Sequence, residues 1–214
     1  MVHLGLAQQR QAPAELLLRR QDVLADGTMI EPSRDLVAEC YGWAVRLINY
    51  YVTHDTPESR AYSSHGARRN TRLQCEAKLG ECVFCLHVGI DPAVSLKWDT
   101  ERGADPDYDV IWRSARIDVK QTQLHYDYLI WPINKNRDFQ KKKFDVLALA
   151  KAQVSFDEEG LTGRGFVAGW IEKDKFYLKR DIAPAGPANG RLTPGTWYLR
   201  PEYLHLMSYW STGG

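Results

Sequence analysis

The chain has 214 residues and a formal net charge of +1, with 28 Lys and Arg residues against 27 Asp and Glu residues. Its hydrophobic content of 44% is enough to form a sizeable core. No apolar run approaches the roughly 18 residues of a membrane span, and the first eleven residues are too polar for a signal peptide. We therefore expect an intracellular, cytoplasmic protein with no membrane partner, and any nucleic-acid partner must be argued from local charge.

The length allows one large domain or two small ones. We predict a helical N-terminal extension (residues 1–70) packed on an α/β core (residues 71–214) that ends in a strand and loop region. In the extension, Ser33 is a candidate N-cap, and the residues after it form an apolar stripe at helical spacing. The stripe consists of Leu36, Val37, Cys40, Ala44, Leu47, Ile48 and Tyr51. The next stretch, 54–66, has the composition of a polar loop.

A second helix is predicted from Thr71 to Ile90, with Gly89 as its stop signal. It contains two acidic residues of interest, Glu76 and Glu81. A helix that precedes a polar hairpin can deliver one glutamate to a site on that hairpin. The ordinary alternative for each glutamate is a position that faces solvent.

The following segment has the pattern of a β-hairpin. Two short runs rich in β-branched and aromatic residues, Tyr108 to Trp112 and Ile117 to Thr122, are separated by a polar turn. We predict a two-residue loop at Ser114 and Ala115. The turn lacks the Asn-Gly or Asp-Gly pair that the favoured hairpin turns prefer.

This loop sets the register of the predicted hairpin. It pairs Ile111 with Asp118 and Asp109 with Lys120. Because side chains alternate between the two faces of a strand, the polar residues then share one face and the apolar residues the other. The polar face consists of Asp107, Asp109, Asp118, Lys120 and Thr122.

Carboxylates and a lysine on one face suit the cleavage of a phosphodiester. A hard metal ion held by carboxylate oxygens binds the phosphate and activates a water molecule, and a nearby lysine orients that water and offsets developing charge. Asp118, the backbone carbonyl of Val119 and Lys120 are the candidates. The stretch from Asp99 to Asp109 holds five acids and one base, which favours a cation. A plain cross-strand ion pair on a solvated face is the alternative.

The residue spacing rejects a calcium loop and disfavours a structural zinc site. A calcium loop that started at Asp105 would need Gly at its sixth position and Glu at its twelfth, where this chain has Val110 and Arg116. A structural zinc site would place its cysteines on turns. Here the cysteines fall within apolar helical patterns, so we expect buried core thiols. The four are Cys40, Cys75, Cys82 and Cys85.

Beyond the hairpin the sequence predicts further sheet strands and two basic groups. Apolar runs at Tyr128 to Pro132, Phe144 to Ala150 and Gly165 to Ile171 are typical of covered strands. A loop is predicted for 181–195, then an aromatic tail with a strand and a short helix. The basic groups are candidates for phosphate contacts, with a solvated surface as the alternative. They consist of Lys135, Arg137, Lys141, Lys142 and Lys143, and of Arg68, Arg69 and Arg72.

With these motifs the chain resembles the PD-(D/E)XK nuclease superfamily, and in particular its small, phage-type members. The resemblance rests on Pro106-Asp107 followed by Asp118-Val119-Lys120, on the helix around Glu81 and on the order of the later strands, over about half of the chain. It implies a restriction-endonuclease-like mixed β-sheet flanked by helices. The resemblance also assigns roles to particular residues. It implies Asp107, Asp118 and Glu81 as metal ligands and Lys120 as the catalytic lysine.

Two points of the resemblance stay open. Asp105 or Asp109 can take the place of Asp107 as the first ligand, because all three precede the second strand at suitable distances. Asp118 stands where Glu is the commoner residue, which the family pattern permits. The prediction is a deoxyribonuclease, specifically an endonuclease, that uses Mg²⁺ or Mn²⁺ and acts on DNA; a homodimer is left open. The alternatives are a non-catalytic nucleic-acid-binding protein and an interaction or inhibitor protein.

Overall fold

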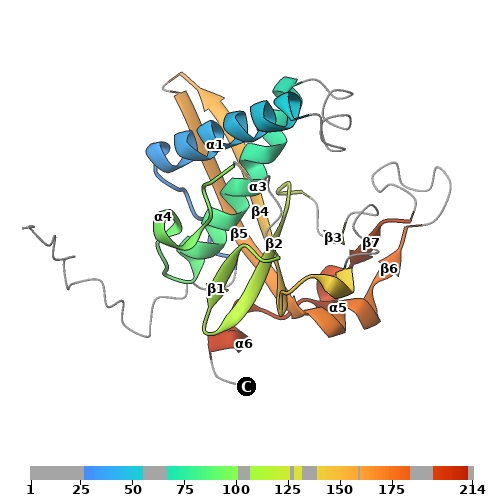
Figure 1. Cartoon of the computed structure of the whole chain (residues 1–214). Coiled ribbons are helices and arrows are strands. Elements are labelled where there is room, and N and C mark those ends of the chain that lie inside the picture. The colour runs from blue at the N-terminus through green and yellow to red at the C-terminus, as the bar shows by residue number, and fades with distance from the viewer. Residues whose placement is uncertain are drawn as a thin grey trace, which may run out of the picture.

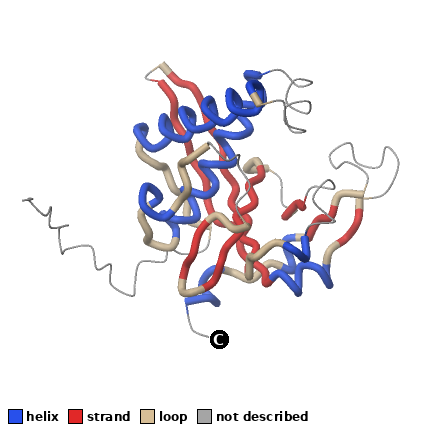
Figure 2. Tube along the Cα trace, in the orientation of Figure 1, coloured by secondary structure: helices blue, strands red, loops and turns tan. Residues whose placement is uncertain are grey.

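The computed structural model of the chain describes residues 27–54, 67–100, 107–125, 128–131, 139–158, 160–183 and 195–211. The first 26 residues and most of the two predicted loops, at 54–66 and 181–195, lie outside this described part. Figure 1 shows helices gathered along a long hairpin of the main sheet, with a smaller sheet beyond its other end. The path of the strands through both sheets is easiest to follow in the tube of Figure 2.

The main sheet is mixed and has four strands in the order β1-β2-β4-β5. β1 and β2 are antiparallel, β2 and β4 are parallel, and β4 and β5 are antiparallel. The parallel pair requires a crossover connection between β2 and β4, and the first strand of the smaller sheet lies within this connection. The strands are β1 (Val110–Trp112), β2 (Ala115–Thr122), β4 (Val146–Asp157) and β5 (Gly160–Glu172).

Helices α1 (Arg34–Thr53) and α3 (Ala67–His87) cover one face of this sheet, and the short α4 (Pro92–Ser95) follows them. Ser33 caps α1, since its hydroxyl accepts a hydrogen bond from the amide of Leu36 at 3.3 Å. The predicted cap is therefore confirmed. The helices approach the sheet closely because β5 carries glycines: a Cβ on Gly163 would lie 2.8 Å from the Leu79 side chain. Bulkier residues at such positions would push α1 and α3 away.

A smaller antiparallel sheet covers part of the opposite face. It consists of β3 (Leu129–Trp131), β7 (Trp197–Leu199) and β6 (Asp181–Ile182), in that order. Together with α5 (Lys173–Lys179) it buries a second, largely aromatic core against the main sheet. The chain then continues through a 3-10 turn, η2 (Pro201–Tyr203), into α6 (Met207–Ser211). The prediction of a strand and a short helix in the aromatic tail is thus confirmed, whereas α5 and β6 were not predicted.

The register predicted for the first hairpin is wrong by two residues. Trp112 pairs with Ala115, so the loop is Arg113-Ser114, and Ile111 faces Arg116 instead of Asp118. Arg113 and Ser114 both adopt positive φ, 47° and 66°. This is the left-handed geometry of the turn that matches the twist of a two-stranded hairpin. Because the error is an even number of residues, it leaves the face of each β2 side chain unchanged.

The β4–β5 hairpin is longer than the apolar runs predict. The predicted strands stop at Ala150 and begin at Gly165, whereas the pairing continues to Asp157 and Gly160. These outer halves mix polar and apolar residues without a continuous apolar run, and they pair with each other. A β-bulge between Leu149 and Ala150 interrupts the register.

The predicted fold class is confirmed at the level of a mixed α/β sheet flanked by helices. The N-terminal helix α1 is also present, and its predicted apolar stripe is largely buried in the core shared with α3 and the sheet. Within the described residues, no helix is long and apolar enough to cross a membrane.

Candidate active site

Asp118 and Lys120 of β2 share one face of the main sheet, as predicted. The ammonium Nζ of Lys120 lies 2.8 Å from Oδ1 of Asp118 and 2.7 Å from Oδ2. Their side chains are only 10% and 22% exposed. The Lys120 ammonium also lies 4.8 Å from the ring centroid of Trp131 on β3, where a cation is attracted by the π-electrons. The smaller sheet therefore forms one wall of this site.

Asp109 joins the site at the edge of β2. Its carboxylate Oδ2 accepts a hydrogen bond of 2.7 Å from the backbone amide of Val119. Since β1 begins only at Val110, this carboxylate takes the place of the backbone acceptor that a longer β1 would offer. In a strand, the N–H and C=O of one residue point to the same side, so the carbonyl of Val119 is directed to this edge as well.

Glu81 reaches the same site from α3. The helix packs tightly on β2 at the preceding residue, Gly80, where a Cβ would lie 2.9 Å from the Cβ of Gln121. This close approach leaves the Glu81 side chain only 14% exposed. We refer to Glu81, Asp109 and Asp118 as the carboxylate cluster.

A buried lysine holds Glu81 in place. The Nζ of Lys78 lies 2.5 Å from Oε2 of Glu81 and donates a hydrogen bond of 3.0 Å to the carbonyl of Lys97. The same ammonium lies 4.4 Å from the Trp43 ring centroid and 5.6 Å from that of Trp98. The Lys78 side chain is only 4% exposed, and a charge buried this deeply needs such partners.

The pKa shifts of Glu81 and Asp109 show that charges within the carboxylate cluster act on these two groups. Burial raises the pKa of Asp109 well above its usual range, and the charges of Glu81 and Asp118 raise it further. Burial also raises the pKa of Glu81, with a further contribution from Asp118, although Lys78 opposes both effects. Burial alone would lower the pKa of Lys78, but the Glu81 carboxylate outweighs it and raises the pKa. Three acidic groups thus compete for two ammonium groups.

The chemistry of this donor set suits a hard divalent cation. Carboxylate oxygens and a backbone carbonyl are the ligands that Mg²⁺ and Mn²⁺ take. Besides burial, the negative charges of Glu81 and Asp118 raise the pKa of Asp109, and a bound cation would neutralise this excess negative charge. Even so, no three His, Cys, Asp or Glu side chains of the described residues lie close enough together to hold a metal ion as they stand. Each carboxylate is instead held by a donor of the protein, namely Lys78, Lys120 or the Val119 amide.

Asp107 lies among other charges. Its negative charge acts on Arg116 and on Lys173, which are not members of the carboxylate cluster. Of Asp107 and Asp109, the two described candidates for the first ligand, Asp109 is the one whose pKa is raised by the charges of Glu81 and Asp118, in addition to burial. Asp105 lies outside the described residues.

Glu76, the other glutamate of α3, is buried and hydrogen-bonded to Arg72 and Val154. It is 1% exposed, and its Oε1 accepts hydrogen bonds from Nε of Arg72 at 3.0 Å and from the amide of Val154 at 3.4 Å. Arg72 also donates to the carbonyl of Val154 at 3.2 Å. Arg72 was predicted as a nucleic-acid contact, and in this arrangement it ties α3 to the outer half of β4.

The remaining basic residues are only partly described. Lys141, Lys142 and Lys143 follow Phe139 after one intervening residue, Gln140, and the Phe139 ring packs against Trp131 at a centroid distance of 4.7 Å. They therefore lie close in sequence to a ring that contacts Trp131, the aromatic neighbour of Lys120. Lys135 and Arg137 lie outside the described residues, and the side chains of Arg68 and Arg69 are likewise outside them.

The four cysteines are buried free thiols, as predicted. Sγ of Cys40 on α1 and Sγ of Cys82 on α3 lie 3.6 Å apart inside the core shared by both helices. Burial raises the pKa of Cys75 to about 12, which keeps this thiol protonated and a poor metal ligand.

Sequence reasoning missed two features of the site. The first is Lys78, although its spacing of three residues from Glu81 is that of a helical ion pair. The second is Trp131, whose position beneath Lys120 depends on how the smaller sheet packs and has no local signal in the sequence. Comparisons of the chain with protein-family models, with curated proteins and with solved structures gave no match.

Proposed function

We propose that this protein is a metal-dependent nuclease of the restriction-endonuclease-like type, a phosphodiester hydrolase that acts on DNA, as an endonuclease. The observation that carries the proposal is the convergence of Glu81 from α3, Asp118 and Lys120 from β2, and Asp109 from the position just before β1. In the proposed site, the carboxylate cluster and the Val119 carbonyl hold Mg²⁺ or Mn²⁺. When bound, the cation supplies a polarised phosphate and a water molecule of lowered pKa.

The protein's own residues supply positioning and charge. Lys120 is held on Asp118 and over Trp131, so its ammonium group is placed to orient the attacking water and to offset negative charge that develops on the phosphate. Lys78 fixes one oxygen of Glu81, and in the proposed site the Glu81 carboxylate contributes to the cation from this position. The limited exposure of these side chains strengthens each of these interactions, because less water screens them.

Plasmid nicking in Mg²⁺ or Mn²⁺, with and without EDTA, tests the proposal. We expect wild-type protein to nick DNA only without EDTA, and Asp118→Ala and Lys120→Ala to lose at least about 100-fold in rate, the usual cost of removing a group that stabilises the transition state. Asp174→Asn and Lys175→Ala are matched controls, since both side chains are exposed on α5.

Equal rates for wild type and both site variants would reject the proposal. The alternative, a non-catalytic nucleic-acid-binding protein, predicts salt-sensitive DNA binding without cleavage in either metal. An interaction or inhibitor protein whose acidic side chains mimic phosphate predicts neither cleavage nor binding.

A further inference from the structure

The outer half of the β4–β5 hairpin presents a second set of polar side chains on the face that carries Lys120. In the parallel register Lys120 pairs with Leu149, and the alternation of side chains along β4 carries this face outward. The opposite face is covered by α1 and α3, where Gly163 and Gly165 meet side chains of both helices. The outward residues are Gln153 and Ser155 of β4, and Arg164 and Thr162, which pair with them from β5.

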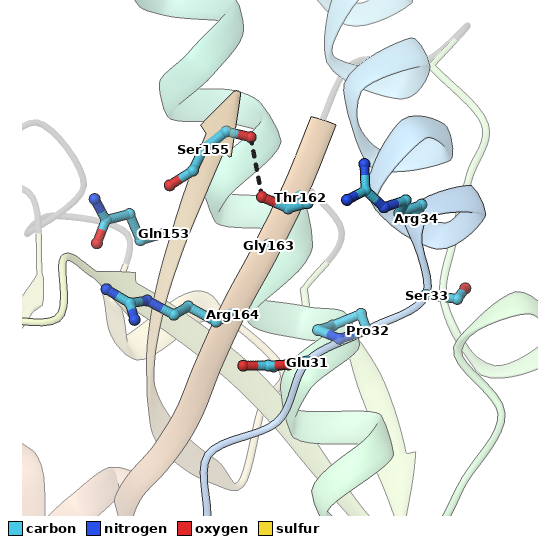
Figure 3. A pocket seen from close by; sticks show the side chains of 9 residues that line it. All are labelled: Glu31, Pro32, Ser33, Arg34, Gln153, Ser155, Thr162, Gly163 and Arg164. Atoms are coloured by element: carbon cyan, nitrogen blue, oxygen red, sulfur yellow. Dashed lines mark hydrogen bonds between the residues drawn. The ribbon is translucent and has the colours of Figure 1, made fainter. Parts of the chain in front are cut away.

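These side chains line a pocket of about 540 Å³, which we call the Arg164 pocket. The chain that leads into α1 closes its other side: Ile30 and Gly165 exchange backbone hydrogen bonds of 2.7 and 2.9 Å, so residues 31–34 run beside β5. Figure 3 shows Arg164 and Gln153 on one side of the pocket and Arg34 on the other. A volume of this size accommodates a group as large as a nucleotide.

The Arg164 pocket offers hydrogen-bond donors that the protein leaves unused. Within the described residues, the side chains of Arg164 and Gln153 make no hydrogen bond or ion pair, and that of Arg164 is exposed. Arg34 supplies a second guanidinium group, which contacts Asp157 at 3.3 Å and is 44% exposed. Guanidinium groups form paired hydrogen bonds with phosphate oxygens.

The pocket also contains an acceptor. Glu31 lines it, and its carboxylate makes no hydrogen bond or ion pair to the described residues. Arg34 and Asp157 balance each other, as do the charges of Arg164 and Glu31, so the pocket does not fit a bare anion best. A nucleotide presents both kinds of group, with phosphate oxygens that only accept and a base edge that also donates.

We propose that the Arg164 pocket binds one nucleotide unit of the nucleic-acid strand that occupies the candidate active site. Arg164 and Arg34 take the phosphate, and Gln153 and Glu31 take the edge of an unpaired base. The inference rests on the proposed function, because the strand must reach both places. Six residues of β4 separate the level of Lys120 from that of Ser155, or about 20 Å at 3.3 Å per residue, which a few nucleotides can span.

Binding of a fluorescent single-stranded oligonucleotide to the full chain in EDTA tests this proposal without any cleavage. We expect Arg164→Ala to weaken binding about tenfold, the worth of one charge-assisted hydrogen bond, and to lower the salt dependence of binding by about one phosphate contact. Gln153→Ala is expected to weaken binding to the single strand more than to a blunt duplex. Arg46→Ala is the matched control, because this arginine is exposed on α1 and pairs with Glu39.

Oligonucleotide binding by Arg164→Ala and Gln153→Ala at the wild-type affinity would overturn the proposal. A free mononucleotide that competes as well as the oligonucleotide would overturn the assignment to a strand. Cleavage of the same oligonucleotide in Mg²⁺ reports on the proposed function separately: loss of binding in Arg164→Ala with no cleavage by wild type would reject the nuclease and retain the pocket.

Discussion

Asp107 and Asp109 are two residues apart, yet their carboxylates serve different neighbours. Asp109 accepts a hydrogen bond from Val119 and interacts with Glu81, whereas the charge of Asp107 acts on Arg116 and Lys173. Of these two acids, Asp109 is the one coupled to Glu81 and Asp118, and the metal-ligand role of Asp107 stays a prediction.

This difference predicts opposite outcomes for two similar variants. Asp109→Asn removes a charge from the carboxylate cluster, and we expect a loss of nicking activity of about 100-fold or more. Asp107→Asn should keep activity within a few-fold of wild type. The measurement is the nicking rate at saturating Mg²⁺ with circular dichroism as a check on folding, and the reverse ranking would move the first ligand to Asp107.

Lys78 compensates a buried charge, so its removal should cost stability. We expect Lys78→Met to lower the free energy of unfolding by about 3 kcal/mol, because it leaves Glu81 desolvated without its partner. The double variant Lys78→Met with Glu81→Gln should recover part of that loss, since no charge is then left unpaired. Urea unfolding followed by tryptophan fluorescence measures both. Additive losses in the double variant would show that the two side chains do not depend on each other.

At the scale of elements, the approach of α3 to β2 is set by one missing side chain. A Cβ on Gly80 would lie 2.9 Å from the Cβ of Gln121 on β2 and 3.6 Å from the Cβ of Ala150 on β4. Contacts below 3 Å cannot be kept, so the helix would have to move, and Glu81 would move with it.

We therefore expect Gly80→Ala to destabilise the protein by about 1–3 kcal/mol, the usual cost of overpacking a core, and to lower cleavage as well. Gly42→Ala on α1 is the matched control, because its Cβ would meet only the flexible end of Arg46 at 3.4 Å. There, helix propensity should raise stability by up to about 1 kcal/mol. Thermal unfolding distinguishes the two, and equal melting temperatures would show that α3 tolerates the methyl group.

The sequence predicts elements in which the buried residues recur at a regular spacing. It fails for segments that are recognised as strands only by their pairing with each other. The stripe of α1 and the stop at Gly89, which has φ of 72°, follow from local rules. The shared face of Asp118 and Lys120 needed only strand alternation. By contrast, the outer halves of β4 and β5 lack the continuous apolar run that predicted the inner halves, and their pairing with each other extends the strands.

Within the site, local sequence patterns also do not predict contacts between segments that are distant in the chain. The turn at Arg113-Ser114 lacks glycine, so its left-handed backbone has no signal in the sequence, and the register was wrong as a result. The roles of Lys78 and Trp131 depend on rings and carbonyls contributed by other elements.

At the scale of the whole molecule, the four thiols lie in one core that joins α1, α3 and the main sheet. All four are fully buried, so a thiol reagent can reach them only when this core opens. We expect no reaction with DTNB in native buffer over the time in which all four react in urea. The absorbance of the released thiolate counts them, and rapid reaction of one or two thiols in native buffer would show that part of this core opens by itself.

The bulge at Leu149 and Ala150 has a consequence for which residues the hairpin shows to solvent. Leu149 faces Gly169 and Ala150 faces Val167, so Ala168 is the one residue of β5 without a counterpart. If all residues of β5 paired with β4 without this bulge, Ala150 would face Ala168 and the distal half of β5 would be out of phase. Arg164 and Thr162 would then turn inward onto the helices, and Gly163 and Gly165 would turn outward. The one extra residue of the bulge thus allows a single strand to contribute to the aromatic core near Ile171 and to the polar pocket near Arg164.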